Sequence, residues 1–413
     1  MKATLYAPVY NGNVEIENLI GSDFISRKPL SSFQEVSVDF LSALSKKILD
    51  TSGIKKYPEL VALAYWLRKA NLVVIINEFK NGVNDSEILV PRGLAFHVAP
   101  SNVDSIFLYS WALSLLAGNS NIVRVTQNLN EQLELLLGLI RELMSEDKWT
   151  EISQRNLIVT YPREEKINSF ISLLADLRIL WGGDETIKSI KSLASKPTTK
   201  DITFADKISY TIINASSYLI AAADSKTNIA KQFYNDSYWF DQMACSSPRF
   251  VFFTGTKDQC EDASSGFWEL LEEQLKLKNE SDTINAAMEK LVYLYESFSV
   301  AQNISATVAQ DKSKPTVARI SAGEIRRFTE TCGGGFFFEC FINDLNDLMK
   351  IVGRKDQTLS YFGFDKSELK NFILKINGTG IDRVVPVGQA LNFGATWDGY
   401  SLLSELTKRI YLT

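Results

Sequence analysis

The stretch Ile88-Leu-Val-Pro-Arg-Gly-Leu-Ala-Phe-His-Val98 is an apolar strand pattern that opens a regular alternation of strands and helices. Helix patterns follow over 103–117, 131–144 and 164–175, alternating with strand patterns over 121–125, 157–161 and 178–181. Strands that alternate with helices of about 10 to 15 residues are typical of βαβ units, whose parallel sheet is covered on both faces. The first half of the chain is therefore predicted to be a doubly wound domain of the nucleotide-binding type.

The flanking parts of the chain extend this α/β pattern. Helical spacing over 36–49 and 59–78 precedes the alternation. A second α/β series begins near Ile208, with strand patterns over 208–213, 249–253, 316–320, 336–341 and 358–362 and a helix pattern over 262–277. Pro197-Thr-Thr-Lys200 is interpreted as the passage between two domains, and a final helix is expected to end the chain.

Composition and charge exclude several classes of protein. The chain has 413 residues, of which 45% are hydrophobic and 23% charged, as expected for a globular protein with two or three domains. The formal net charge of -5, with both signs interspersed, argues against a nucleic-acid partner. No apolar run approaches the roughly 18 residues of a membrane span, and the start lacks the pattern of a signal peptide. A cytoplasmic, soluble protein is expected.

The cysteine and histidine content limits the chemistry. The four cysteines form no CxxC pair and His97 is the only histidine, so no metal site is expected. A Ser/His/Asp triad would need His97, and no GxSxG elbow occurs. His97 alternates with apolar neighbours on its strand, which favours a core histidine over a catalytic one. Cys332-Gly-Gly-Gly335 leads into a strand, so it is interpreted as a tight turn instead of a phosphate loop.

Cys245 is the candidate nucleophile. It lies among small residues between a helical stretch that ends near Asn235 and the apolar strand over 250–253. Pro248 prevents a helix from continuing, so the thiol is expected on a loop at the entrance of a strand. The alternative is an inert core thiol, because cysteine is among the most buried residue types.

The sequence around Cys245 resembles that of a known family. Asp241-Gln-Met-Ala-Cys-Ser-Ser-Pro248 resembles the nucleophile loop of acyl-CoA reductases of the bacterial luminescence (LuxC) type, a branch of the aldehyde dehydrogenase superfamily. Further segments resemble the family in the same order: Pro91-Arg-Gly93 through Pro100-Ser-Asn-Val103, Leu116-Ala-Gly-Asn119, Ile122-Val-Arg124, Trp181-Gly-Gly-Asp184, Asp356-Gln-Thr358 and Trp397-Asp-Gly399. The resemblance extends from about Leu89 to the C-terminus.

This resemblance implies an aldehyde-dehydrogenase-like fold with two doubly wound α/β domains. A cofactor-binding domain would span 1–205, with 380–413 returning to it, and a catalytic domain carrying Cys245 would span 206–379. The implied activity is reduction of an activated acyl group to an aldehyde through a thioester on Cys245. Asn102 resembles the asparagine that stabilises the oxyanion. Without the resemblance, Asn102 reads equally well as a helix N-cap.

The resemblance also implies cofactor-binding roles for Arg124, Thr126, Gly182 and Gly183. Gly182-Gly183 follows a strand and opens a helix, so its N–H groups could face a cofactor phosphate, although a plain capped turn is the alternative. Arg124 falls where the superfamily often has a ribose-binding lysine, and an arginine there could meet a 2′-phosphate. NADP(H) is therefore preferred over NAD(H), with a solvated arginine as the competing interpretation.

One departure from the superfamily sharpens the expected outcome. Hydrolytic aldehyde dehydrogenases activate water with a glutamate, whereas the corresponding stretch here is Ile202-Thr-Phe-Ala-Asp206. Slow thioester hydrolysis is expected, which suits a reductase, but no base for Cys245 can be named. The alternatives are a glutamyl-phosphate-reductase-like enzyme and a non-catalytic scaffold. An acyl-CoA or acyl-protein thioester substrate, an acyl-protein synthetase as partner and pairing of copies are implied by resemblance alone.

Overall fold

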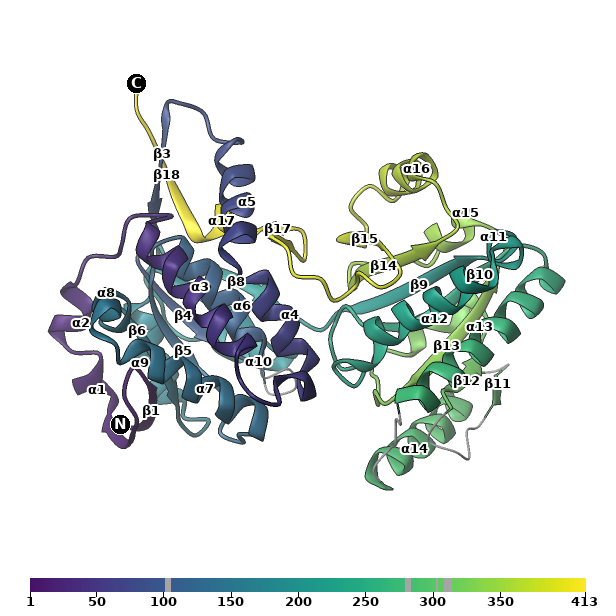
Figure 1. Ribbon diagram of the computed structural model, residues 1–413, viewed down its shortest axis with the longest axis horizontal. Helices are drawn as coiled ribbons and strands as arrows, with labels where there is room; N and C mark the ends of the chain where they lie inside the picture. The colour runs from purple at the N-terminus through teal and green to yellow at the C-terminus, as the bar shows by residue number, and fades with distance from the viewer. Residues whose placement is uncertain (101–104, 279–283, 302–303, 308–313) are drawn as a thin grey trace. The chain divides into compact units, whose positions relative to one another are not determined.

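The computed structural model describes residues 1–100, 105–278, 284–301, 304–307 and 314–413 of the chain. These residues form two compact units (Figure 1). Unit 1 comprises Met1–Asp206 and Phe393–Thr413, and unit 2 comprises Lys207–Asn392. The predicted fold class, two doubly wound α/β domains with a C-terminal segment returning to the first, is confirmed.

Unit 1 is built on a seven-stranded sheet in the order β2-β1-β6-β5-β4-β7-β8. Its strands are β1 (Lys2–Ala7), β2 (Asn11–Glu15), β4 (Leu94–Val98), β5 (Ser120–Arg124), β6 (Asn156–Thr160), β7 (Leu177–Trp181) and β8 (Lys200–Phe204). The five strands β6, β5, β4, β7 and β8 are parallel to one another, and β1 pairs antiparallel with both β2 and β6. Every residue of β4, β6 and β7 is buried, as expected where helices cover both faces of a parallel sheet.

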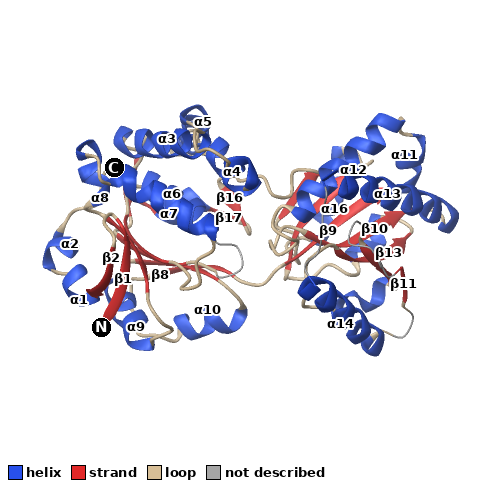
Figure 2. Cartoon of the chain, turned by 60° about the horizontal axis from the view of Figure 1, so that its bottom comes forward, coloured by secondary structure: helices blue, strands red, loops and turns tan. Residues whose placement is uncertain are grey.

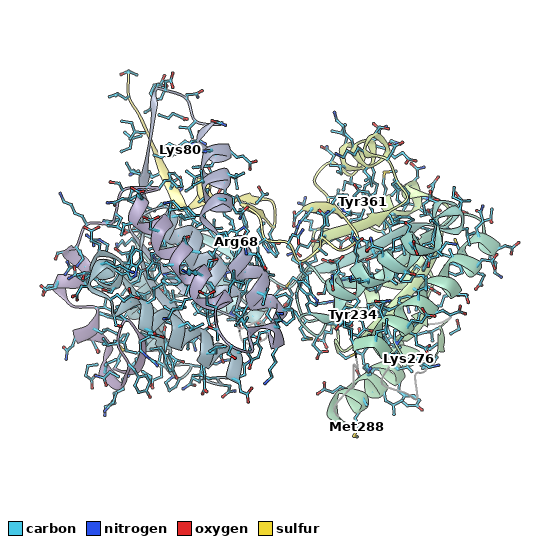
Figure 3. All side chains as sticks on the ribbon, in the orientation of Figure 1. Arg68, Lys80, Tyr234, Lys276, Met288 and Tyr361 are labelled. Atoms are coloured by element: carbon cyan, nitrogen blue, oxygen red, sulfur yellow. The ribbon has the colours of Figure 1, made fainter. Side chains whose placement is uncertain are left out.

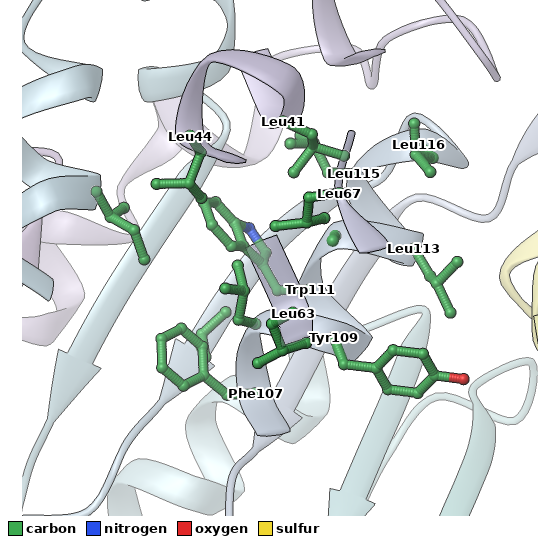
Figure 4. Close-up of a cluster of buried hydrophobic side chains, with 14 of the residues drawn as sticks. Leu41, Leu44, Leu63, Leu67, Phe107, Tyr109, Trp111, Leu113, Leu115 and Leu116 are labelled. Atoms are coloured by element: carbon green, nitrogen blue, oxygen red, sulfur yellow. The ribbon is translucent and has the colours of Figure 1, made fainter. Parts of the chain in front are cut away.

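Helices cover both faces of this sheet, as Figure 2 shows. One face carries α3 (Glu35–Leu49), α4 (Pro58–Trp66), α5 (Lys69–Lys80), α6 (Ile106–Leu116), α7 (Glu131–Met144) and α8 (Thr150–Ser153). The other carries α1 (Ile16–Leu19), α2 (Ser22–Ser26), α9 (Glu165–Leu174) and α10 (Asp184–Lys191). Leucines of α3, α4 and α6 pack around the buried Trp111 in the larger core (Figure 4).

The structure divides two segments that the sequence patterns left continuous. The expected strand over 88–98 is two strands, because β3 (Glu87–Pro91) leaves the sheet and β4 begins after Gly93. Gly93 has a φ of 132°, in the region that favours glycine. The helical stretch over 59–78 breaks at Arg68 (Figure 3), whose ψ of 139° is extended. The Arg68 guanidinium lies 4.0 Å from the Tyr65 ring centroid.

The end of the chain also differs from the expectation. It forms β16 (Thr396–Trp397), β17 (Tyr400–Ser401), the short helix α17 (Leu402–Leu406) and the strand β18 (Thr407–Tyr411). β18 pairs antiparallel with β3, and this two-stranded ribbon stands out from unit 1 (Figure 1). The expected final helix is present as α17, but the expectation that it ends the chain was wrong, because residues 407–411 form a ladder with the edge of β3.

Unit 2 is a second seven-stranded sheet in the order β11-β12-β13-β10-β9-β14-β15. Its strands are β9 (Ile208–Asn214), β10 (Pro248–Thr254), β11 (Ser305–Thr307), β12 (Thr316–Arg319), β13 (Phe336–Ile342), β14 (Asp356–Phe362) and β15 (Arg383–Pro386). All neighbours are parallel except β11 with β12. One apolar core lies against α11 (Ala215–Ile220), α12 (Ala223–Tyr238) and α13 (Lys257–Lys278). The other lies against α14 (Ile284–Val300), α15 (Leu345–Met349) and α16 (Lys366–Ile376).

The chain leaves unit 1 later than Pro197–Lys200, the passage expected from the sequence. Lys200 begins β8, which pairs with β7 at the edge of the unit 1 sheet, and the boundary falls between Asp206 and Lys207. The return to unit 1 begins at Phe393, because β15 still pairs with β14 in unit 2. The expected passage was wrong because a proline followed by polar residues marks a turn of any kind, including one inside a domain.

Candidate active site

Cys245 lies on a tight loop that joins α12 to β10. The chain turns sharply after the helix, where Asp241 and Gln242 have φ values of 49° and 60°. Such left-handed conformations are uncommon outside glycine and persist only where the surroundings hold them. Two short backbone bonds, Met243 N–H to Phe240 O at 2.8 Å and Ser247 N–H to Ala244 O at 2.9 Å, complete two consecutive turns. The structure thus places Cys245 on a loop at the entrance of a strand, where the sequence placed it.

The Gln242 side chain fastens this loop to the neighbouring strand. It is fully buried, and its Nε2 donates to the carbonyls of Pro248 at 2.9 Å and Phe336 at 2.8 Å. Its Oε1 accepts from the N–H groups of Gly335 and Phe336, both at 3.0 Å. All four hydrogen bonds of a primary amide are therefore made. They tie the nucleophile loop to the start of β13 and to the start of β10.

Ser209 holds the backbone of Cys245 from the other side. Ser209 is a buried residue near the start of β9, and its Oγ donates to the Cys245 carbonyl at 2.6 Å. The same oxygen accepts from the Thr358 N–H at 3.2 Å, at the start of β14. The position of Cys245 is thus set at the amino ends of β9, β10 and β14.

The triple glycine of Cys332-Gly-Gly-Gly335 is needed for this packing. All three glycines have left-handed φ values, between 62° and 78°. A Cβ on Gly333 would lie 2.6 Å from the Asp241 carbonyl oxygen, and one on Gly335 would overlap the Tyr238 hydroxyl. The Gly334 N–H also donates to the Asp241 carbonyl at 3.0 Å. This is the tight turn predicted from the sequence, and its second role is to let the nucleophile loop approach β13 closely.

The other three cysteines are poor candidates for a reactive thiol. Burial raises the pKa of Cys260 to about 11 and that of Cys332 to about 12, and it raises the pKa of Cys340 well above the ordinary value. A thiol is nucleophilic only as the thiolate, so these groups are inert near neutral pH. Cys245 is half-buried and forms no disulfide.

The cofactor-site candidates of unit 1 lie at the carboxyl edge of its sheet. The five parallel strands run in the order β6-β5-β4-β7-β8, which is the third, second, first, fourth and fifth strand along the chain. The strand order reverses between β4 and β7, and ligands of doubly wound sheets bind outside the carboxyl ends at such a switch point. Gly182 and Gly183 directly follow β7. Asn102 follows β4 but lies outside the described residues.

The turn after β7 carries more negative than positive charge. Gly182 has a φ of 150° and its N–H donates to the Phe204 carbonyl at 3.2 Å, while Gly183 is the N-cap of α10. Asp184 occupies the first turn of α10, and a Cβ on Gly183 would lie 3.2 Å from an Asp206 carboxylate oxygen. Carboxylates accept from hydroxyls and repel phosphates, so this turn suits the ribose of a dinucleotide better than its phosphates.

Arg124 is the last residue of β5, the second strand of the parallel series. Its guanidinium lies 4.9 Å from the ring centroid of the buried Tyr161, and its buried Nε has no hydrogen-bond partner among the described residues. In dinucleotide-binding folds this strand end commonly carries the residue that contacts the adenosine ribose. A guanidinium with an unused donor fits a 2′-phosphate. Thr126 is half-buried two residues later, and its Oγ1 accepts from the Asn128 N–H at 3.3 Å.

His97 is a core residue, as predicted. It is buried in the middle of the sheet, with Nδ1 3.3 Å from Ser110 Oγ and Nε2 3.0 Å from Asn121 Oδ1. Burial lowers its pKa to about 4, so the ring is neutral at physiological pH. Both ring nitrogens are engaged, which leaves neither available as a catalytic base.

Within the parts of the chain that the structure describes, no three His, Cys, Asp or Glu side chains come together as a metal ligand set. None of the helices in those same parts combines the length and apolar character needed to cross a membrane.

The roles of Gln242 and Ser209 did not emerge from the sequence. Gln242 stands inside the segment that resembles the family's nucleophile loop, so its place in that motif could have drawn attention. Ser209 precedes Cys245 by 36 residues. No sequence signal marks it, because a serine at the start of an apolar strand is common.

Comparison with known proteins found a matching protein family and a curated relative. Residues 67–409 match the protein family described as acyl-CoA reductase (LuxC). A stretch of 168 residues is 26% identical to a long-chain acyl-protein thioester reductase of Aliivibrio fischeri. This stretch is 40% of the chain and 33% of that protein, so the match spans about a third of the relative's length.

Solved structures with a similar fold include aldehyde dehydrogenases. Aldehyde dehydrogenase 21 of Physcomitrella patens, in complex with succinate, superposes with a TM-score of 0.63 at 12% identity, over 91% of this chain and 85% of that one. A NAD-dependent benzaldehyde dehydrogenase of Corynebacterium glutamicum has a TM-score of 0.63 at 14% identity, over 92% and 85% of the two chains. At these identities the likeness shows an aldehyde-dehydrogenase-like fold.

Proposed function

Because the chain belongs to the acyl-CoA reductase (LuxC) family, we propose that it reduces an activated acyl group to an aldehyde through a thioester on Cys245. The observation that carries this proposal is the position of Cys245, which is half-buried on a loop held by Gln242 and Ser209. The three other thiols are held protonated by burial.

In this mechanism the Cys245 thiolate attacks the acyl carbonyl carbon. The bond from that carbon to the donor sulfur breaks, and the donor leaves as a thiolate that takes up a proton. When bound, a reduced nicotinamide cofactor supplies a hydride. Cys245 holds the acyl group until the carbonyl carbon is reduced and then leaves as the thiolate, releasing the aldehyde. Asn102 is proposed to donate a hydrogen bond to the oxyanion, which would lower the activation barrier by about 2.7 to 4 kcal/mol.

We propose that unit 1 holds the cofactor and that Arg124 favours NADP(H) over NAD(H). The unused Nε donor of Arg124 supports this, as does its place at the end of the second parallel strand. Thr126, Gly182 and Gly183 would line the same edge. Arg124→Gln should raise the KM for NADPH about tenfold or more and leave that for NADH nearly unchanged, because a charge-assisted bond to phosphate is lost. An equal effect on both cofactors would contradict the assignment.

The stretch Ile202–Asp206 supports reduction over hydrolysis. Ile202 and Phe204 are buried in β8, and this stretch has no glutamate to activate water. An acyl group on Cys245 would therefore persist until it is reduced. The donor is proposed to be a long-chain acyl thioester, carried by CoA or by a protein such as an acyl-protein synthetase. The name of the Aliivibrio fischeri relative supports a protein-bound acyl group.

Intact-mass measurement after mixing with acyl-CoA of several chain lengths tests the covalent step. We expect an adduct of one acyl group on the wild type, none on Cys245→Ala and an unchanged adduct on Cys332→Ser, the matched control. Aldehyde should form only when reduced cofactor is added. A wild type that takes up no acyl group from any donor, or a Cys245→Ala variant that is still labelled, would overturn the proposal.

A further inference from the structure

The hydroxyl of Ser209 connects three strands to the backbone of Cys245. It donates to the Cys245 carbonyl at 2.6 Å and accepts from the Thr358 N–H at 3.2 Å. Ser209 is fully buried, so its hydroxyl group has no contact with bulk water. The Thr358 N–H donates to a lone pair of the Ser209 hydroxyl oxygen, so the hydroxyl proton is available to donate to the Cys245 carbonyl.

We propose that Ser209 is a positioning residue for Cys245, holding its carbonyl so that the sulfur stays oriented and its thiolate is not opposed by the carbonyl oxygen. The peptide between Cys245 and Ser246 is planar, so fixing its carbonyl also fixes the ψ angle of Cys245. The partial negative charge of the carbonyl oxygen is held on the Ser209 side. If the carbonyl were released, it could turn toward the sulfur, and its charge would raise the thiol pKa.

The Ser209 contact acts at a different point of the loop from the Gln242 bonds. Gln242 fastens the first part of the loop to β13 and reaches Pro248 at its end. These bonds lie three residues to either side of Cys245. The Ser209 bond acts on the carbonyl of Cys245 itself. The Ser247 N–H to Ala244 O bond closes a turn across the same peptide, and Ser209 adds a side-chain donor to its carbonyl.

The same two strands offer a matched control. Thr211 and Ser360 lie two residues further along β9 and β14, and their hydroxyls are 2.7 Å apart. Both are fully buried, as Ser209 is. Neither contacts the nucleophile loop in any described hydrogen bond. Ser360→Ala therefore removes a buried hydroxyl of equal kind from the same sheet without touching Cys245.

The pH dependence of Cys245 alkylation tests the proposal. Iodoacetamide labelling, read at the peptide level by mass spectrometry, reports the thiolate fraction without acyl donor or cofactor. For Ser209→Ala we expect labelling at pH 7 to slow at least about fivefold, with the midpoint of the pH profile shifted upward. Ser209→Thr, which keeps the hydroxyl, should stay within about twofold of the wild type, and so should Ser360→Ala.

The inference rests on the proposed function, but the two can fail separately. If Cys245 takes up no acyl group yet its alkylation depends on Ser209, the function fails and the positioning role stands. If Ser209→Ala labels like the wild type, or Ser360→Ala slows as much, the positioning role is refuted whatever the acyl experiment shows. If Ser209→Ala does not fold, Ser209→Cys can be tested in its place. Its thiol is a weaker donor, so alkylation of Cys245 should again be slower than in the wild type, by a smaller factor. In the reductase assay, Ser209→Ala should lower kcat and leave the KM for the cofactor unchanged.

Discussion

Replacing Gln242 by methionine should destabilise the attachment of the Cys245 loop to the start of β13. Methionine keeps the length and approximate volume of glutamine but makes none of its four hydrogen bonds. Each such bond contributes about 1 kcal/mol net, and a buried group left without a partner costs about 1 to 3 kcal/mol. The Phe336 N–H keeps a second bond, to Gly333 O at 3.2 Å, whereas the Gly335 N–H has no second acceptor among the residues that the structure describes. We therefore expect a loss of about 3 to 5 kcal/mol in unit 2.

Hydrogen exchange measured by mass spectrometry can localise this effect. A loss of 3 to 5 kcal/mol corresponds to roughly 150- to 4,000-fold faster exchange of the amides at 333–338, provided that they exchange through the opening of this loop. Peptides from α7 in unit 1 serve as the internal control and should be unchanged. Exchange at 333–338 within about fivefold of the wild type would refute the reasoning, because it would mean that the four bonds contribute little.

Gln242→Glu separates the acceptor from the donor half of the interaction. A carboxyl keeps an oxygen for the Gly335 and Phe336 N–H groups but, when ionised, places a second oxygen against two carbonyls. Burial and these carbonyls should raise the pKa of the new group above its unfolded value. The folded state then binds more protons, so stability falls as pH rises from about 4.3 toward the folded pKa. The stability difference between Gln242→Met and the wild type should not change with pH in this way.

Three further predictions concern Asp236 and Gly335 of unit 2 and His97 of unit 1. Burial raises the pKa of Asp236 to about 7, so the free energy of unfolding should fall by up to about 3 kcal/mol between pH 5 and 7. Urea titrations at several pH values should show this fall in the wild type and not in Asp236→Asn. The single imidazole signal of His97 should titrate with a midpoint near 4 by NMR, because burial lowers its pKa; a midpoint near 6.5 would contradict the buried position. Gly335→Ala should lower the free energy of unfolding by more than about 2 kcal/mol, because its Cβ would overlap the Tyr238 hydroxyl. Gly334→Ala should lower it by about 1 kcal/mol, from backbone strain alone, because the nearest atom, on Lys290, is 3.6 Å away. Equal unfolding midpoints for the two variants would refute the overlap.

Local sequence patterns were sufficient for most of the architecture. The helix predicted over 131–144 matches α7, and the strands predicted after Ile208 correspond to β9, β10, β12, β13 and β14. These patterns succeed because the period of apolar residues follows directly from which faces of an element are buried. The loop position of Cys245 was equally readable, since Pro248 blocks a helix and the apolar strand follows at once.

Pairing partners and contacts between distant residues were decided only by the tertiary structure. The run over 88–98 reads as one strand, yet β3 pairs with residues more than 300 positions later while β4 enters the main sheet. Nothing local in the sequence could show this, because a strand's partner is chosen by the folded chain. The same holds for Ser209: its hydroxyl matters only because β9 brings it to the Cys245 carbonyl. The sequence thus determined which residue could be the nucleophile, and the packing of three strand ends determined what holds it.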